Sequence, residues 1–175
     1  MRKPKHPRAE HSPSGGWVDT SGARVRVLPP MLFAAPISVA ALLRRRSPSP
    51  PAEGPRWVVA VVVALSGAAM MGWAFAVLRK HHTTVVPWAH VHELVTHGPF
   101  RWVRNPIYVG DVLVYLGACL WLRTWWPALA LPGVLTALRR WVIQPEEQYL
   151  RSRFPQEYEA YAAQVPALVP RRRRP

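Results

Sequence analysis

Cysteine and acidic residues are scarce in this chain of 175 residues. It has one cysteine, Cys119, and nine Asp and Glu against 23 Lys and Arg. A single cysteine excludes an intramolecular disulfide framework and a Cys-based zinc motif. Five of the seven histidines lie between residues 81 and 97, but their spacing fits no usual zinc motif. We therefore predict no metal site. Catalytic Ser-His-Asp order, a glycine-rich phosphate loop and a dinucleotide fingerprint are also missing.

The formal net charge of +14 lies mostly in the two ends of the chain and beside its apolar runs. Residues 2–5 and 171–174 are basic but carry no interleaved aromatic residues on which bases could stack. We therefore expect no nucleic-acid partner. Contact with anionic lipid head groups explains such a charge distribution better.

Long uncharged runs dominate the rest of the chain. Residues 57–78 contain no charged side chain and, at about 1.5 Å per residue, are long enough to cross a hydrocarbon core of roughly 30 Å. Runs 28–43, 107–122 and 125–143 are also apolar. Only Arg123 and Thr124 separate the last two, and so short a connection predicts an antiparallel helical hairpin. We predict an all-α integral membrane protein with about four membrane helices.

We place the membrane domain at residues 27–170, between two basic tails. The Pro-, Ser- and charge-rich residues 1–26 predict a disordered basic tail. Several prolines divide the polar segment after residue 143 into short amphipathic helices, which we place at the membrane interface. Within the membrane domain we predict a cofactor loop at 79–106 and the interfacial segment at 144–170. A second basic tail follows at 171–175.

The basic residues predict the orientation. With four spans, 18 Lys and Arg lie on the side of both termini and loop 79–106, and five lie on the other side. Because Lys and Arg are retained in the cytoplasm, we expect a multi-pass protein of the cell inner membrane with both termini cytoplasmic. The five residues on the other side are Arg44, Arg45, Arg46, Arg56 and Arg123. The cluster of Arg44, Arg45 and Arg46 opposes this orientation.

The start of the third apolar run combines helix signals with aromatic and basic residues. Asn105 predicts a helix N-cap, and Pro106 suits the first helical position. Phe100, Trp102 and Arg104 therefore gather where the helix meets the membrane interface. One interpretation is a binding site. The alternative is an interfacial belt, with aromatic rings at the head groups and arginine on phosphates.

Carboxylates are predicted near the start of the third apolar run. Asp111 shares a helix face with Tyr108, and a carboxylate within a membrane helix is costly unless it faces a cavity or a partner. The alternative is that Asp111 stays hydrated near the interface. The hairpin also returns Glu146 and Glu147 to this region, where carboxylates and aromatic rings together would suit a cationic ligand. In the alternative, these glutamates are solvated and Glu147 pairs with Arg151.

The ordered motifs resemble a known family. They read His92-x-Leu94-Val95, Gly98-Pro99-Phe100-Arg101-x-x-Arg104-Asn105-Pro106-x-Tyr108-x-Gly110, Glu146-Glu147-x-x-Leu150 and Phe154-x-x-Glu157-Tyr158-x-x-Tyr161. In this combination the chain, over about residues 28–170, resembles the isoprenylcysteine carboxyl methyltransferase and phospholipid methyltransferase group of integral membrane enzymes.

The resemblance implies an S-adenosylmethionine-dependent methyltransferase with a lipophilic or lipid acceptor, whose reacting group is a carboxylate, an amine or a thiol. Carried over by motif, the expected catalytic residues are Asn105, Glu146 and Glu147. The expected cofactor-binding residues are His92, Leu94, Val95, Gly98, Phe100, Arg104, Asn105, Pro106, Tyr108 and Glu147. The expected acceptor contacts are Trp102, Asp111 and Arg140.

One departure from the family bears on the acceptor. Asn105 stands where eukaryotic carboxyl methyltransferases carry His, and an amide cannot titrate, so a base at this position is excluded. Two other function classes stay open. One is a non-catalytic membrane scaffold of the same fold, and the other is a membrane oxidoreductase similar to sterol reductases, which share the carboxy-terminal Tyr-x-x-Tyr pattern.

Overall fold

The computed structural model of the protein describes residues 28–46, 54–81 and 93–168. Every regular element in these ranges is a helix, which confirms the predicted all-α class. The elements are α1 (Pro29–Arg46), α2 (Arg56–Lys80), the 3-10 turn η1 (Gly98–Arg101), α3 (Pro106–Trp121), α4 (Trp126–Leu138), the π-helical segment η2 (Arg139–Ile143), α5 (Gln144–Arg153) and α6 (Pro155–Gln164). The predicted tails lie outside the described residues.

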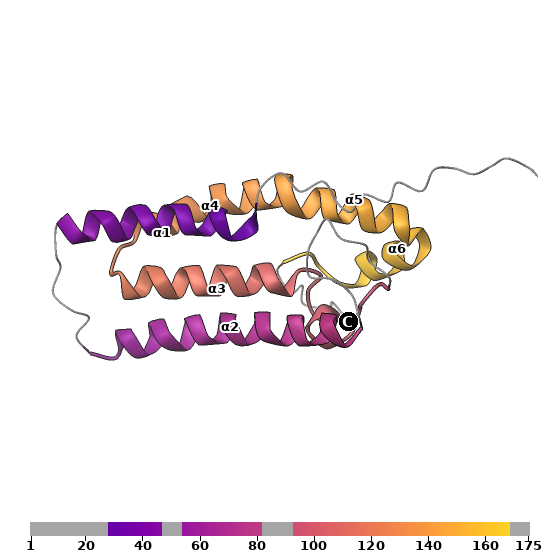
Figure 1. The fold of residues 1–175 in the computed structure, drawn as a ribbon, viewed down its shortest axis with the longest axis horizontal. Coiled ribbons are helices and arrows are strands. Elements are labelled where there is room, and N and C mark those ends of the chain that lie inside the picture. Colours follow the sequence, from indigo (N-terminus) through magenta and orange to yellow (C-terminus); the bar gives the residue numbers. More distant parts are fainter. Residues whose placement is uncertain (1–27, 47–53, 82–92, 169–175) are drawn as a thin grey trace, which may run out of the picture.

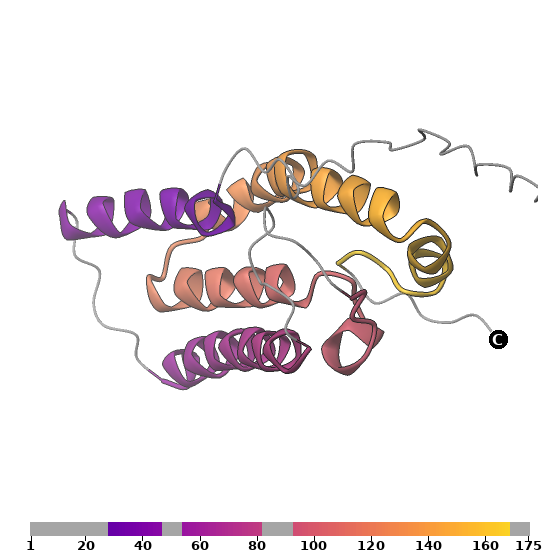
Figure 2. The same ribbon diagram turned by 45° about the vertical axis from the view of Figure 1, so that its right-hand side comes forward.

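Helix α3 lies between α2 on one side and a layer of α1 and α4 on the other (Figures 1 and 2). Helices α1 to α4 alternate in direction along the chain. We call the two ends of the bundle the distal end and the site end. The distal end holds the last turns of α1 and α3 and the first turns of α2 and α4. The site end holds the start of α3 together with η1, α5 and α6.

Small residues bring α2 and α3 into close contact. The buried positions of α2 include Ala60, Gly67 and Ala74, which recur every seven residues and form one narrow stripe. A Cβ atom on Gly67 would lie 2.5 Å from the carbonyl oxygen of Gly110, and one on Gly117 would lie 2.8 Å from that of Ala60. Backbones this close need glycine on the facing helix, as at helix contacts in membranes.

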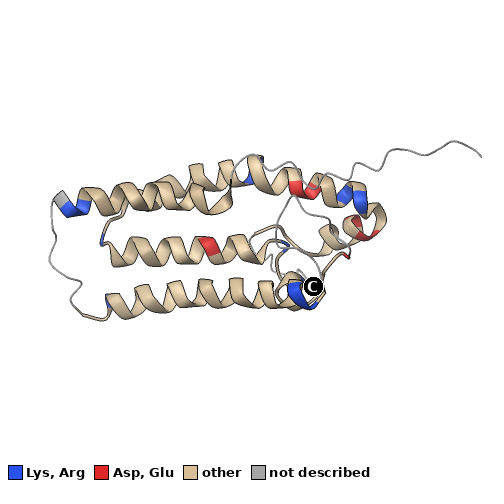
Figure 3. Ribbon diagram, in the orientation of Figure 1, with Lys and Arg blue, Asp and Glu red and all other residues tan. Residues whose placement is uncertain are grey.

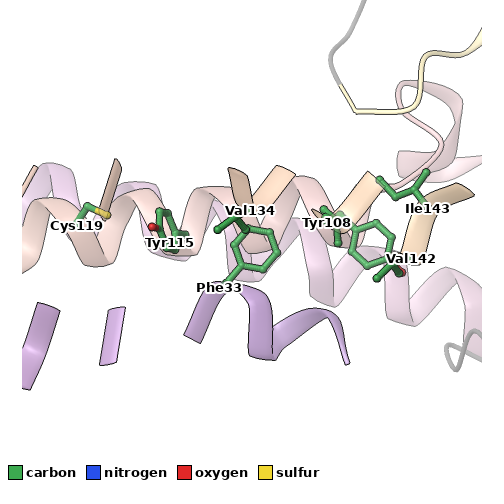
Figure 4. Packing of buried hydrophobic residues seen from close by; sticks show 8 residues of the cluster. Phe33, Tyr108, Tyr115, Cys119, Val134, Val142 and Ile143 are labelled. Atoms are coloured by element: carbon green, nitrogen blue, oxygen red, sulfur yellow. The ribbon is translucent and has the colours of Figure 1, made fainter. Parts of the chain in front are cut away.

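The main core joins α3 to the opposite layer. Phe33 of α1 packs edge-on against Tyr115, with ring centroids 5.9 Å apart, and the hydroxyl of Tyr115 donates to the carbonyl oxygen of Pro127. Figure 4 shows these side chains meeting the residues of α4 and η2. The buried members of this cluster are Phe33, Tyr108, Tyr115, Cys119, Val134, Leu138, Val142 and Ile143.

Charged residues lie mainly near the two ends of the bundle, and few lie along its middle (Figure 3). Asp111 of α3 is the exception among the described helices. In the described part of the chain, α2 alone is long and apolar enough to cross a membrane by itself, and α3 is apolar but shorter. The number of four membrane helices stays a prediction.

The segment that follows α4 differs from the prediction, in which prolines divide it into separate short helices. Pro155 does begin α6, but Pro145 interrupts nothing, because α4, η2 and α5 follow one another without a break. A proline lacks the amide hydrogen that an α-helix needs and clashes with the carbonyl four residues earlier. The wider π turn just before it, in which the amide of Gln144 donates to the carbonyl of Arg139, accommodates this defect.

Candidate functional site

The loop before α3 is fixed against the end of α2. Gly98 begins η1 with a φ of +63°, in the left-handed region that favours glycine. A Cβ atom there would lie 3.0 Å from a methyl carbon of Val77. The turn that follows buries Phe100 against Ala74, Leu78 and Val95. The predicted residues Val95, Gly98 and Phe100 thus shape the loop through its packing on α2.

The chain then pairs with its own C-terminal segment. The backbone amide of Arg104 donates to the carbonyl of Pro166 at 2.8 Å, and that of Asn105 donates to the carbonyl of Ala167 at 3.1 Å. The side-chain amide of Asn105 donates to the same Ala167 oxygen at 3.0 Å. Asn105 does occupy the N-cap position of α3, but its side chain makes no capping hydrogen bond. The predicted N-cap position is thus confirmed, and the side chain is turned toward the segment after α6, to which its amide group donates.

Arg104 connects the start of α3 to both C-terminal helices. Its Nη2 atom lies 2.7 Å from Oε1 of Glu147 in α5, and its Nη1 atom donates to the carbonyl of Ala162 in α6 at 3.1 Å. The two charged side chains are only 14% and 19% exposed. The guanidinium also lies 5.9 Å from the ring centroid of Tyr158. This ion pair replaces the alternative pairing of Glu147 with Arg151, because Arg151 pairs instead with Glu159 at 3.4 Å.

Glu146 faces the start of α3 in a different way. The hydroxyl of Tyr108 donates to Oε2 of Glu146 at 3.1 Å, and no Lys or Arg within the described ranges forms an ion pair with this carboxylate. Burial raises the pKa of Glu146 to about 7. The hydrogen bond from Tyr108 acts in the opposite direction, and the charge of Glu147 adds to the rise. Glu146 therefore changes its charge near neutral pH.

Helix α6 also contacts the loop before α3. The hydroxyl of Tyr161 donates to the carbonyl of Phe100 at 2.7 Å, and Tyr158 packs edge-on against Tyr161. Burial raises the pKa of both phenols, so both stay protonated at neutral pH. Two buried donors, Nε of Arg104 and the hydroxyl of Tyr158, have no hydrogen-bond partner among the described residues.

The predicted approach of α5 to the start of α3 is thus seen in two contacts, Arg104–Glu147 and Tyr108–Glu146. Leu94 packs on the cluster of Tyr158 and its neighbours. Pro106 is buried at the first turn of α3. His92 lies outside the described residues.

The predicted acceptor contacts are less closely grouped. Asp111 lies one turn beyond Tyr108 on α3, and it makes no hydrogen bond or ion pair with the described residues. Trp102 is about half exposed and packs edge-on against Trp73 at 5.2 Å. Arg140 is exposed on η2 and makes no hydrogen bond or ion pair with the described residues.

Sequence reasoning missed the structural part played by α6 and the segment behind it. Tyr158 and Tyr161 belong to a quoted motif, and their i, i+3 spacing on a short helix indicates one buried face. No sequence pattern points to the carbonyls of Ala162 and Ala167, because any residue supplies a backbone acceptor.

The described histidines of this region, His81 and His97, do not belong to a group of residues that could hold a metal ion. His81 Nδ1 lies 3.2 Å from Oε2 of Glu93, and the rings of His81 and His97 are 4.4 Å apart. No group of three His, Cys, Asp or Glu that could hold a metal ion occurs within residues 28–46, 54–81 and 93–168.

The fold and the site define an all-helical bundle with two adjacent glutamates, several tyrosines and an arginine at one end. Comparison with known proteins identifies its family. The family model for phospholipid methyltransferase matches residues 55–157. The chain belongs to this family, as the motifs predicted.

Individual relatives are similar over about half of this chain. Protein-S-isoprenylcysteine O-methyltransferase of Schizosaccharomyces pombe is 38% identical over 79 residues, or 45% of this chain and 34% of the relative. A probable protein-S-isoprenylcysteine O-methyltransferase of Oryza sativa subsp. indica is 33% identical over 89 residues, or 51% and 47%. Cobalt-zinc-cadmium resistance protein CzcN of Cupriavidus metallidurans is 38% identical over 84 residues, or 46% and 37%.

The chain thus matches less than half the length of each of these relatives. No solved structure is significantly similar to it.

Proposed function

We propose that the protein is an integral membrane methyltransferase that uses S-adenosylmethionine to modify a lipophilic acceptor at the membrane interface. The observation that carries this proposal is Glu146, a partly buried carboxylate held by Tyr108 beside the start of α3 and paired with no cation in the described part of the chain. Family membership supports the reaction type. The relatives' names, which specify O-methyltransferases of protein-S-isoprenylcysteine, support a lipid-bearing acceptor.

The exposed surface supports placement in a bilayer. Helix α2 is buried only along its narrow stripe toward α3, and the rest of its surface is apolar and exposed. Soluble proteins rarely leave such extended apolar patches uncovered. In the proposed arrangement α1, α2, α3 and the α4–η2 segment cross the membrane, and α5 and α6 lie at its cytoplasmic surface. Exposed apolar residues of the bundle include Met31, Val39, Leu42, Val59, Val62, Leu65, Val114 and Leu129.

The residues at the site end fit the cofactor. When bound, S-adenosylmethionine supplies a methyl group on a sulfonium cation. Glu146 offers a carboxylate that no arginine of the described residues neutralises, and Tyr108 orients this carboxylate through its hydroxyl. The buried donors of Arg104 and Tyr158 lack partners in the described ranges, as expected of groups that meet a ligand or an ordered water. His92, Leu94, Val95, Gly98, Phe100 and Pro106 complete the proposed lining.

The two glutamates take different proposed roles. Glu147 is neutralised by Arg104, so this pair positions α5 and α6. Glu146 changes charge near neutral pH, so it can accept a proton from an amine or thiol acceptor. A carboxylate acceptor would arrive ionised and need no base. Asn105 cannot titrate, and it holds the C-terminal segment through Ala167.

The acceptor is proposed to enter from the bilayer. Trp102 and Arg140 are exposed at the site end, where an aromatic ring and a guanidinium suit the apolar and polar parts of a lipid head-group region. Asp111 lies further along α3, beyond Tyr108, and faces the proposed path of the acceptor. For a displacement reaction, the protein has to align the acceptor with the methyl donor and exclude water from the site.

Binding of the cofactor tests the proposal. Purified full-length protein in detergent is titrated with S-adenosylmethionine by calorimetry, together with Glu146→Gln, Tyr108→Phe and the control Glu157→Gln, an exposed acid of α6. We expect Glu146→Gln to weaken binding by roughly tenfold, as loss of one charge-assisted contact does, and the control to change it less than twofold. Unchanged binding in Glu146→Gln would refute the site.

The same preparation discriminates the two alternatives. A parallel titration with a reduced nicotinamide cofactor is expected to show no binding. Binding of the nicotinamide cofactor alone would favour an oxidoreductase, and binding of neither would favour a scaffold.

A further inference from the structure

Helix α5 directs its two glutamates at the start of α3, although a turn that is not α-helical separates it from α4. Leu138, at the end of α4, is fully buried in the main core. Glu146 and Glu147 of α5 contact Tyr108 and Arg104. The segment η2 lies between Leu138 and these glutamates. The helix therefore presents the same side to α3 before and after η2.

An uninterrupted α-helix would not present the same side to α3 throughout. Each residue of an α-helix turns the chain by about 100°. Glu147 follows Leu138 by nine residues, which in an α-helix make about two and a half turns. The side chain of Glu147 would then leave the helix on the side opposite to Leu138 and face away from α3. Its bond to Arg104 excludes that geometry.

The π turn supplies the rotation that an α-helix lacks here. The amide of Gln144 donates to the carbonyl of Arg139, so this turn holds one residue more than an α turn. The additional residue turns the following helix back by about 100° relative to an unbroken α-helix. Glu146 then lies within about 20° of the direction of Leu138, and Glu147 lies within about 80° of it.

The burial of Ile143 indicates the same rotation independently. In an unbroken α-helix, the side chain of Ile143 would point about 140° away from that of Leu138. It is instead 2% exposed and belongs, with Val142, to the core cluster that includes Tyr108 (Figure 4). The additional residue is accommodated on the opposite side of the helix. The exposed residues there are Arg139, Arg140 and Trp141.

We propose that η2 is the positioning element of the site, because its additional residue rotates α5 so that Glu146 and Glu147 face the start of α3. Pro145 keeps the turn wide, since in a regular α-helix its ring would clash with the carbonyl of Trp141. Single π turns within helices occur frequently at functional sites. The rotation rests on the contacts of the chain alone. Its consequence, that the additional residue determines the affinity for S-adenosylmethionine, rests on the proposed function.

Changes of chain length within η2 test the rotation. In the deletion variant, Trp141 is removed and Pro145 is replaced by alanine, so that a regular α-helix directs both glutamates as the π turn does. In the insertion variant, one alanine is added between Trp141 and Val142, which rotates α5 by about 100°. Trp141→Ala controls for loss of the 43% exposed ring. An alanine added between Gly54 and Pro55, where Gly54 has open space around it, controls for the added length.

The rotation is measured without any ligand. In each full-length background, Arg104→Gln and Glu147→Gln are combined in a double-mutant cycle on the unfolding midpoint in detergent. We expect the two changes to be non-additive in the wild type, the deletion variant and both controls, and additive in the insertion variant. Hydrogen exchange of α2 and α3 checks that the bundle is folded.

Two results would overturn the inference. One is additive effects in a folded deletion variant, and the other is full coupling of Arg104 and Glu147 in a folded insertion variant. If the deletion variant does not fold, the insertion variant decides alone, because it keeps every residue of the bundle.

Titration with S-adenosylmethionine tests the consequence for the site. We expect the deletion variant to bind within about threefold of the wild type, and the insertion variant to bind at least about tenfold more weakly. Equal affinities of the two variants would refute the consequence. A wild type that does not bind the cofactor, but shows the expected pattern of coupling, would refute the proposed function and leave the rotation standing.

Discussion

Removing either partner of the Arg104–Glu147 ion pair is expected to detach α5 and α6 from the start of α3. The pair is 2.7 Å long and less than one fifth exposed on either side, and Arg104 also holds the carbonyl of Ala162. Breaking a buried pair leaves an uncompensated charge and costs about 3–5 kcal/mol. For a chain of this size, that corresponds to a fall of roughly 6–20 °C in the unfolding midpoint.

A double-mutant cycle isolates the pair from the other contacts of each residue. Arg104→Gln, Glu147→Gln and the double variant are compared with the wild type by thermal unfolding in detergent and by hydrogen exchange of α6. We expect each single change to destabilise strongly and the double change to cost less than their sum, with a coupling of about 2 kcal/mol. The exposed pair Arg151–Glu159, whose side chains are 50% and 61% exposed, is the control, with a coupling of about 0–1 kcal/mol.

Additive effects of the two changes, or equal coupling in the buried and the exposed pair, would refute the role given to Arg104. A loss of cofactor binding without any change in α6 exchange would instead assign Arg104 to direct ligand contact.

Three other predictions follow from the packing and charges. The pKa of Glu146 is about 7 in the folded protein and 4.5 in the unfolded chain. Its contribution to stability is therefore greatest below pH 4.5 and falls as the pH rises through 7, by at most about 3 kcal/mol. The unfolding midpoint of Glu146→Gln should lack this fall, and parallel pH curves of the variant and the wild type would contradict the shift. Gly67→Ala places a Cβ atom 2.5 Å from the carbonyl of Gly110 and should lower thermal stability by about 1–3 kcal/mol, whereas Gly72→Ala, with open space around it, should be neutral or stabilising. Reporter fusions after residues 50 and 175 should report opposite sides of the membrane, and the same side for both would contradict the four-span orientation.

The helices were predictable because their apolar runs are long and their boundaries carry clear signals. Pro106 after Asn105 marks the start of α3, and Pro155 marks that of α6. The proximity of Glu146 to Tyr108 followed from the short turn at Arg123 and Thr124, which returns the chain to the site end. These predictions depend only on local sequence and on the direction in which successive helices run.

Other features depend on contacts that single residues do not reveal. The side chain of Asn105 could cap α3 or bind the segment behind α6, and only the fold brings Ala167 within its reach. The sequence offered Arg151 as the partner of Glu147, and the pairing with Arg104 instead follows from how α5 packs. The π segment before Pro145 was missed because a proline in a helix has several remedies, of which a wider turn is one.

The transfer of a methyl group to a membrane lipid tests the proposed function most directly. Purified protein is incubated with methyl-labelled S-adenosylmethionine and either native membranes or a soluble extract, and the products are partitioned between organic and aqueous phases. We expect label in the organic phase from membranes, greatly reduced by Glu146→Gln and retained by Glu157→Gln. Label only in water-soluble products would contradict a lipophilic acceptor, and no label in either phase, despite measured cofactor binding, would contradict the methyltransferase itself.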